Sequence, residues 1–229
     1  MTELNKKNCL VIGRNSSLGT EISKYFSSMD YRVIGSSVSA TSQDSSTQLL
    51  LDLTRPHTFD SFASNISNID CLIFAAGLLP GKALNKFSYE EIREVFEVNS
   101  VGIVTLFKYL EEKLNDSGSV IFLNSIAAFN GSFDPIYASS KSSLSGFIKS
   151  MAKNTKRKIR YNELALGLVR NTNMFQEFEK KDLERHLNEI PMAEYGDPTE
   201  IAKICFDICQ PHWSYLNGQT IHLNGGRYV

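Results

Sequence analysis

The fold of this chain is decided by the stretch CLVIGRNSSLG at residues 9–19, near the N-terminus. Its first four residues are apolar and typical of a buried strand, and the rest form a turn of mostly small residues. When a helix follows such a turn, backbone N–H groups and the helix dipole together favour a pyrophosphate. The stretch therefore predicts a nucleotide-binding turn, with a plain strand–helix connection as the structural alternative.

Outward from this stretch, short apolar runs alternate with longer amphipathic ones. The runs predict further strands at 32–34, 49–51, 70–74, 119–123, 159–166 and 220–223, and the amphipathic segments predict helices at 22–29, 55–66, 88–114, 136–156 and 199–209. This alternation is typical of an α/β fold, a single doubly wound parallel sheet of about seven strands flanked by helices. No repeat or interior linker interrupts the pattern, so we expect one domain over residues 1–229. The serine-rich stretch at 36–47 is expected to be a loop with little helical signal.

Composition excludes several classes of protein. Of the 229 residues 42% are hydrophobic and 21% charged, and 24 Lys and Arg against 25 Asp and Glu give a net charge of -1. That balance argues against nucleic acid or an anionic membrane as a partner. The N-terminus is polar, without the apolar segment of a signal peptide, and no apolar run is long enough to span a membrane. Four cysteines without a CxxC pair are expected to be reduced core thiols, which favours a cytoplasmic protein.

The end of the second predicted strand bears on the choice of nucleotide. An NAD-binding strand ends in an acidic residue that binds the adenosine ribose, but this one ends in Gly35-Ser36-Ser37. Hydroxyl groups can donate to a 2′-phosphate that a carboxylate would repel, and Arg14 adds a positive charge nearby. The sequence therefore favours NADP(H), with NAD(H) as the alternative.

Two predicted helices carry polar residues on their apolar stripes. Asn99 lies in the stripe of the first, where a buried amide has to be hydrogen-bonded; a purely structural Asn is the other interpretation. In the second, Tyr137 and Lys141 lie one turn apart on the side that faces the core. A Lys ammonium near the phenol would lower the tyrosine pKa from about 10, which suits a general acid for a carbonyl oxygen.

The spacing Tyr-x-x-x-Lys is unspecific by itself, because the chain contains it a second time at Tyr109 and Lys113. Tyr109 comes late in its helix, where both side chains are easily solvated. Tyr137 instead begins a helix shortly after Ser125, which follows a strand at the carboxyl edge of the sheet. Ligands bind at that edge in open α/β sheets, so Tyr137 and Lys141 are the candidates.

The combination of Gly13, Gly19, Asn99, Ser125, Tyr137 and Lys141 resembles the short-chain dehydrogenase/reductase family, in its compact single-domain branch, and is closest in kind to 3-oxoacyl carrier-protein reductases. The resemblance covers nearly the whole chain and includes Asp52-Leu53, the segments at 74–77 and 160–169, Thr172, and the segments at 191–202 and 217–226. It implies a dinucleotide-binding Rossmann domain with a substrate lid at about 172–195. It also implies hydride transfer between nicotinamide and a carbonyl or secondary alcohol.

The resemblance also implies the site residues. Tyr137 is expected to be the general acid in reduction, Lys141 to lower its pKa and hold the nicotinamide ribose, Ser125 to bind the substrate oxygen and Asn99 to position a proton-relaying water. The cofactor-binding residues it implies are Gly13, Arg14, Asn15, Ser17, Leu18, Gly19, Ser36, Ser37, Asp52, Leu53, Ala75, Ala76, Gly77, Tyr137, Lys141, Gly167, Val169 and Thr172. No metal is expected, because His57, His186, His212 and His222 lack ligand spacing.

The chain departs from the family pattern at positions outside the four catalytic ones. Ser17 replaces a glycine of the phosphate turn, Phe74 and Ala75 replace two asparagines, and Leu166 replaces a proline.

Because the four catalytic positions are intact, an NAD(P)-dependent ketone reductase acting on a 3-oxoacyl-type substrate is the preferred function. The alternatives are an oxidoreductase for a sugar or nucleotide-sugar ketone, and a catalytically inactive cofactor-binding sensor or scaffold.

The substrate pocket is expected to have an apolar wall with aromatic faces. Its predicted lining is Leu78, Leu79, Ile126, Ala127, Phe129, Phe133, Val169, Met174 and Phe175. Lys180, Lys181 and Arg185 are candidates for an acidic carrier's docking patch, but acidic residues interleave them and a solvated helix face is the preferred interpretation. By the resemblance, the helices at 88–114 and 136–156 and the last strand mediate a homodimer or homotetramer.

Overall fold

The computed structural model describes residues 6–38 and 48–229. The strands are β1 (Asn8–Ile12), β2 (Arg32–Ser37), β3 (Gln48–Leu50), β4 (Ile69–Phe74), β5 (Leu114–Ser125), β6 (Arg160–Leu166) and β7 (Thr220–Leu223). The helices are α1 (Ser17–Ser28), α2 (Phe59–Ser64), α3 (Tyr89–Phe96), α4 (Gly102–Leu110), α5 (Ala127–Asn130), α6 (Pro135–Asn154), α7 (Asn173–Gln176), α8 (Lys180–Asn188) and α9 (Pro198–Ile208).

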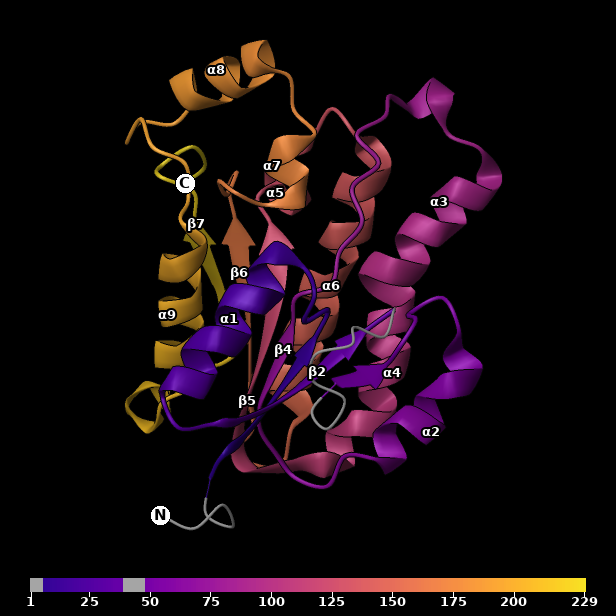
Figure 1. The fold of residues 1–229 in the computed structure, drawn as a ribbon, viewed down its shortest axis with the longest axis vertical. Helices are drawn as coiled ribbons and strands as arrows, with labels where there is room; N and C mark the ends of the chain where they lie inside the picture. The colour runs from indigo at the N-terminus through magenta and orange to yellow at the C-terminus, as the bar shows by residue number, and fades with distance from the viewer. Residues whose placement is uncertain (1–5, 39–47) are drawn as a thin grey trace.

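The strands form one seven-stranded sheet in the order β3-β2-β1-β4-β5-β6-β7, and every neighbouring pair is parallel. This confirms the predicted doubly wound α/β fold. The order reverses between β1 and β4, so the loops after these two strands diverge and leave room for a ligand at the carboxyl edge. Figure 1 shows α5, α7 and α8 gathered beyond that edge of the sheet.

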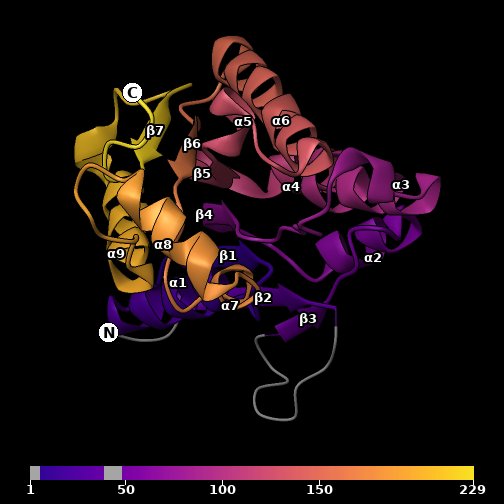
Figure 2. The same ribbon diagram turned by 90° about the horizontal axis from the view of Figure 1, so that it is seen from above.

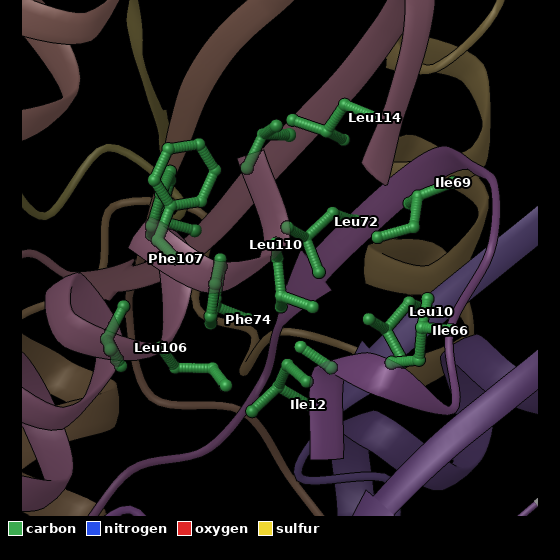
Figure 3. Packing of buried hydrophobic residues seen from close by; sticks show 14 of the residues in the cluster. Leu10, Ile12, Ile66, Ile69, Leu72, Phe74, Leu106, Phe107, Leu110 and Leu114 are labelled. Atoms are coloured by element: carbon green, nitrogen blue, oxygen red, sulfur yellow. The ribbon is translucent and has the colours of Figure 1, made fainter. Parts of the chain in front are cut away.

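Helices cover both faces of the sheet, as Figure 2 shows from above, with α1 and α9 on one side and α2, α4 and α6 on the other. The side chains of each strand alternate between the two hydrophobic clusters, since Leu72 faces the second set of helices and Ile73 the first. Figure 3 shows the larger cluster, in which α4 contributes Leu106, Phe107 and Leu110 against the strands. The catalytic candidates therefore project from strands and helices that are closely packed in these two clusters.

The helix starts follow from capping residues in the sequence. Ser16 begins α1 by accepting a hydrogen bond from Gly19 N, and Ser88 forms a reciprocal capping box with Glu91 at the start of α3. Asp134 and Asp197 begin α6 and α9 in the same way, each followed by a proline at the first helical position. The orientation of α6 matters most, because Tyr137 lies in its first turn.

The helix predicted at 88–114 is not continuous. A π-helical turn at Glu97–Val101 separates α3 from α4, and it contains Asn99. Such a turn accommodates an extra residue and is frequent at functional sites, because it redirects a side chain that a regular helix would point elsewhere. Two other differences are the longer β5 and the short helices α5 and α7, which the sequence did not predict.

The predicted loop at 36–47 lies mostly outside the described residues, since its positions 39–47 are not described. The four cysteines are free and buried, as expected for core thiols. Within residues 6–38 and 48–229, no helix is long and apolar enough to cross a membrane.

Candidate active site

The turn after β1 brings two backbone segments so close together that side chains have no room. Gly13 has φ +85°, and a Cβ on it would lie 2.7 Å from the Ala76 backbone nitrogen. A Cβ on Gly19 would lie 2.2 Å from the Gly13 carbonyl oxygen. Both glycines are therefore required by the packing of the turn against α1 and the loop after β4.

Serine hydroxyls attach this turn to β2. The Gly13 amide donates to Ser36 Oγ at 3.0 Å, and the Asn15 side chain donates to Ser37 Oγ at 2.8 Å. Both serines are buried, and Arg14 packs its aliphatic stem against Gly35. The predicted adenosine-side residues Gly13, Arg14, Asn15, Ser36 and Ser37 are thus brought together.

Tyr137 is 6% exposed, and it lines the same two cavities as Ser125. Burial raises the pKa of Tyr137 to about 12, which the neighbouring Ser125 hydroxyl opposes and the negative charge of Asp134 reinforces. The direction of this shift is opposite to the lowering expected from Lys141, because burial of the phenolate is the largest cause. The role of Lys141 in lowering the Tyr137 pKa stays a prediction.

Lys141 lies one turn along α6 and is 4% exposed. Its ammonium donates to the Leu123 carbonyl oxygen at 3.0 Å, at the end of β5. Burial lowers the pKa of Lys141 to about 8, and the negative charge of Glu163 on β6 opposes that shift. A buried ammonium near one side of a tyrosine–serine pair is an arrangement suited to proton transfer.

Asn99 is completely buried, and its amide makes hydrogen bonds in two directions. Its Oδ1 accepts from Leu78 N at 2.8 Å and its Nδ2 donates to Leu78 O at 2.8 Å and to Ser140 Oγ at 3.0 Å. Through Asn99, the π-helical turn thus binds both backbone polar groups of Leu78 in the loop after β4. A Cβ on Gly77 would lie 3.4 Å from Lys141 Nζ and 3.7 Å from Asn99 Oδ1, so Asn99 reaches the neighbourhood of Lys141.

A cavity of about 190 Å³ joins the phosphate turn to the catalytic candidates. The predicted residues that line it are Ser17, Leu18, Ala75, Ala76, Gly77, Ser125, Tyr137, Lys141, Gly167, Val169 and Thr172. The predicted residues that do not line it are Gly13, Arg14, Asn15, Gly19, Ser36, Ser37, Asp52, Leu53 and Asn99. Of these, Leu53 is buried in the core, and the Asp52 carboxylate binds Thr54 and Arg55.

A second cavity of about 520 Å³ shares Ser125 and Tyr137 with the first and opens beside the lid. Five of the residues predicted for the substrate wall line it, namely Leu79, Ile126, Ala127, Phe133 and Met174. Leu78, Phe129, Val169 and Phe175 do not line this cavity. Phe129 instead packs on His222 and Tyr228, and Phe175 on Tyr195, because α5 and α7 turn those rings away.

The charged side chains of α8 pair with one another. Lys181 lies 2.7 Å from Glu179 and Arg185 3.2 Å from Asp182, and these lysine and arginine side chains are well exposed. This arrangement agrees with a solvated helix face. Arg185 and Asp182 also line the second cavity, so its wall combines charged side chains with apolar ones.

Three polar residues of the site were not singled out from the sequence. Asn124 and Glu163 are buried beside Lys141, and Asn173 of the lid bonds to Ser17 of the phosphate turn. Glu163 could have been found from the sequence, because it is a charged residue inside a strand that is predicted to be buried. A buried ion needs a partner. The Ser17–Asn173 contact left no signal, because it joins two loops far apart in the chain.

Comparisons with known proteins agree with this geometry. The model of a family described as enoyl-(acyl carrier protein) reductase matches residues 12–227. A 3-oxoacyl-(acyl-carrier-protein) reductase of Buchnera aphidicola is 31% identical and covers 98% of each chain, and carbonyl reductase family member 4 of Xenopus tropicalis is 29% identical over 96% of this chain and 97% of its own. A short-chain dehydrogenase/reductase structure from Brucella melitensis, titled glucose/ribitol dehydrogenase, superposes with a TM-score of 0.90 at 21% identity over 97% of both chains. The last likeness concerns the fold alone.

Proposed function

The chain belongs to the short-chain dehydrogenase/reductase family of oxidoreductases, and on that premise we propose that it is an NADPH-dependent ketone reductase. In this proposal a hydride passes between the nicotinamide and a carbonyl carbon, and the reverse reaction oxidises a secondary alcohol. The preferred substrate is a 3-oxoacyl thioester. The names of several curated relatives support that substrate class, as do the apolar residues Leu79, Ile126 and Met174 in the wall of the second cavity.

The observation that carries the proposal is the pairing of Tyr137 with Ser125 where the two cavities meet. A carbonyl oxygen placed between these hydroxyls receives a hydrogen bond from Ser125 and a proton from Tyr137. With a pKa of about 12, Tyr137 is protonated throughout the neutral range and is ready to act as the acid. In the reverse direction the phenolate oxygen of Tyr137 accepts the proton of the alcohol.

The residues present fit a nicotinamide dinucleotide. The turn between Gly13 and Gly19 places the N-terminus of α1 at the first cavity, which Ser17 and Leu18 line, and Gly77 lines the same cavity beside Lys141. In our proposal Lys141 holds the nicotinamide ribose hydroxyls, and Thr172 and Val169 bind the carboxamide end. Bound NADPH supplies the hydride, and its oxidised form adds a positive charge that favours the Tyr137 phenolate.

The preference for NADPH rests on the two serines of β2. Their hydroxyl oxygens accept hydrogen bonds from the phosphate turn, and the Ser36 hydroxyl, which accepts from the Gly13 amide, can also donate its own proton. Neither serine carries the negative charge that repels a 2′-phosphate, and the guanidinium of Arg14 starts from the same turn. This combination supports NADPH over NADH.

We also propose that the chain works as a homo-oligomer in a reducing compartment such as the cytoplasm. Tyr89 of α3 and Val101 of the π-helical turn are large exposed apolar residues on the helices that the sequence assigns to subunit contacts. Four buried free thiols suit a reducing compartment. Light scattering on the protein as it elutes from a size-exclusion column measures the number of subunits. A monomer at micromolar concentration contradicts the proposed homo-oligomer.

The test is a steady-state panel with purified protein. We expect NADPH oxidation with 3-oxoacyl thioesters, a lower kcat/KM with simple ketones, and a lower kcat/KM with NADH than with NADPH. Sugar-derived ketones as the best substrates would move the assignment to the alternative substrate class. Tight cofactor binding without turnover on any carbonyl would favour an inactive sensor or scaffold.

A further inference from the structure

A carboxylate is buried in the middle of β6, between Asn162 and Leu164. Glu163 is 1% exposed, and it faces the same side of the sheet as α6. Its Oε2 accepts from Asn124 Nδ2 at 2.5 Å and from Ser145 Oγ at 3.0 Å, and its Oε1 accepts from Thr220 Oγ1 at 2.5 Å. Both carboxylate oxygens are therefore hydrogen-bonded, which is the condition for keeping such a group in a core.

The hydrogen bonds of Asn124 link this carboxylate to two catalytic candidates. Asn124 Nδ2 also donates to the Lys141 carbonyl oxygen at 3.3 Å, and Asn124 Oδ1 accepts from the Ser125 backbone nitrogen at 2.9 Å. Asn124 thus spans the gap between the end of β5 and the middle of α6. Because Glu163 accepts from the Asn124 amide, Glu163 sets the orientation of that amide. In this orientation the amide reaches both the Lys141 carbonyl oxygen and the Ser125 backbone nitrogen.

Glu163 also supplies a charge. The other groups that the structure places around the Lys141 ammonium are uncharged: the Leu123 carbonyl, the Gly77 backbone, the Asn99 amide and the phenol of Tyr137 one turn away. Among the titratable groups of residues 6–38 and 48–229, Glu163 is the one whose charge acts on Lys141, while Asp134 acts on Tyr137. A buried ammonium without an opposite charge would tend to lose its proton.

We propose that Glu163 is a positioning residue for Lys141 and Ser125, holding the Lys141 ammonium charged and, through Asn124, fixing the distance between α6 and the end of β5. This inference rests on the proposed reductase function for its kinetic consequences. Its structural content, a charged Glu163 that controls the protonation of Lys141, is independent of any turnover.

The first test is the pair Glu163→Gln and Asp70→Asn. Gln keeps the shape of Glu163 without its charge, and Asp70 is a matched control because its carboxylate is also hydrogen-bonded, to Asn8 N and Asn115 Nδ2, but at the opposite edge of the sheet. We expect E163Q to move the titration midpoint of the Lys141 side chain, followed by ¹³C NMR at Cε, downward by about one pH unit from its value of about 8. D70N should leave it unchanged.

The kinetic readout separates charge from structure. In E163Q, kcat/KM for carbonyl reduction should be close to that of the unaltered protein at pH 6, where Lys141 is protonated in both, and about fivefold lower at pH 8. An equal loss at every pH would mean a merely structural role and would overturn the proposal, as would an unmoved Lys141 midpoint. If the unaltered protein reduces no carbonyl, the proposed function fails, and the NMR titration still decides this inference.

A second measurement does not need E163Q to fold. The carboxyl ¹³C resonance of Glu163 in the unaltered protein, assigned through its loss in Glu163→Asp, should shift near pH 8 as Lys141 loses its proton. A carboxyl resonance that does not respond near pH 8 contradicts the proposal.

Discussion

Two halves of the same sheet edge are built in different ways. We call the residues around Ser125, Tyr137 and Lys141 the catalytic half, and those around the 13–19 turn, Ser36 and Ser37 the adenosine half. In the catalytic half, buried side chains bond to backbone atoms of regular elements, as Lys141 does to Leu123. In the adenosine half, serine hydroxyls at the end of β2 accept hydrogen bonds from the turn, as Ser36 does from the Gly13 amide and Ser37 from Asn15. Backbone-anchored groups hold one geometry, whereas hydroxyl contacts leave room for substitution. Chemistry and cofactor choice should therefore be separable.

The largest expected effect is in the catalytic half. Tyr137→Phe keeps the ring and the packing of α6 but removes the proton donor, so kcat for carbonyl reduction should fall by about 10³-fold or more. Cofactor affinity, measured by fluorescence titration with NADPH, should stay within about twofold because Phe retains the buried ring. If NADPH binding were lost together with turnover, the two halves would not be separable.

The second effect is the pH dependence of the catalytic half. Burial lowers the pKa of Lys141 to about 8, so its ammonium is present below pH 8 and is lost above it. Tyr137, with a pKa of about 12, remains protonated over that range. We therefore expect kcat/KM for reduction to fall about tenfold per pH unit above pH 8.

Lys141→Arg is the control for that assignment. The guanidinium stays charged beyond pH 12, so the alkaline fall should vanish although the activity at neutral pH is lower. A fall that persists unchanged in K141R would assign the titration to another group. The comparison needs pH–rate profiles of both proteins at saturating cofactor.

The third effect tests the adenosine half. Ser36→Asp preserves an acceptor for the Gly13 amide but places a negative charge where a 2′-phosphate would lie. The KM for NADPH should rise about tenfold while kcat at saturation stays nearly constant, a change of about 1.4 kcal/mol in binding. Ser36→Thr, which keeps the hydroxyl, is the matched control. An unaltered NADPH-to-NADH preference in S36D would remove the serines from the specificity argument.

The smallest effect concerns the contact between the phosphate turn and the lid. Ser17 Oγ donates to Asn173 Oδ1 and accepts from Asn173 N, both at 3.2 Å, at the start of α7. Ser17→Ala removes both bonds, and because the pair is exposed, NADPH should dissociate only about two- to threefold faster. Stopped-flow fluorescence measures that rate. Ser17→Gly, which restores the residue typical of such turns, should behave like S17A; opposite changes would mean that backbone freedom, not the hydroxyl, controls the lid.

Much of the catalytic half was predictable because its residues interrupt a strong pattern. Asn99, Tyr137 and Lys141 stand on apolar helix stripes, and Ser125 follows a strongly apolar strand, so each is conspicuous against its surroundings. Their protonation was not predictable. The pKa of Tyr137 depends on how completely α6 buries the phenol, and the sequence pattern contains no measure of that burial.

Less of the adenosine half and the lid was predictable. The prediction that Asp52 and Leu53 bind the cofactor stays a prediction, since the cavity that contains Tyr137 does not extend to them. Phe129 and Phe175 were expected in the substrate wall, yet α5 and α7 turn their rings onto neighbouring aromatic residues. Short helices of four residues carry too little periodicity to be recognised.

By itself, the sequence determined the parallel α/β sheet, the glycine-bearing turn after its first strand and the helix that carries Tyr137 and Lys141. These follow from hydrophobic periodicity and local sterics, which are properties of neighbouring residues. Only the tertiary structure decided that Asn99 lies in a π-helical turn, that Ser17 meets Asn173 and that Glu163 reaches Asn124. Each of these depends on a contact between elements distant in the chain, and such contacts exist only after the elements have packed together.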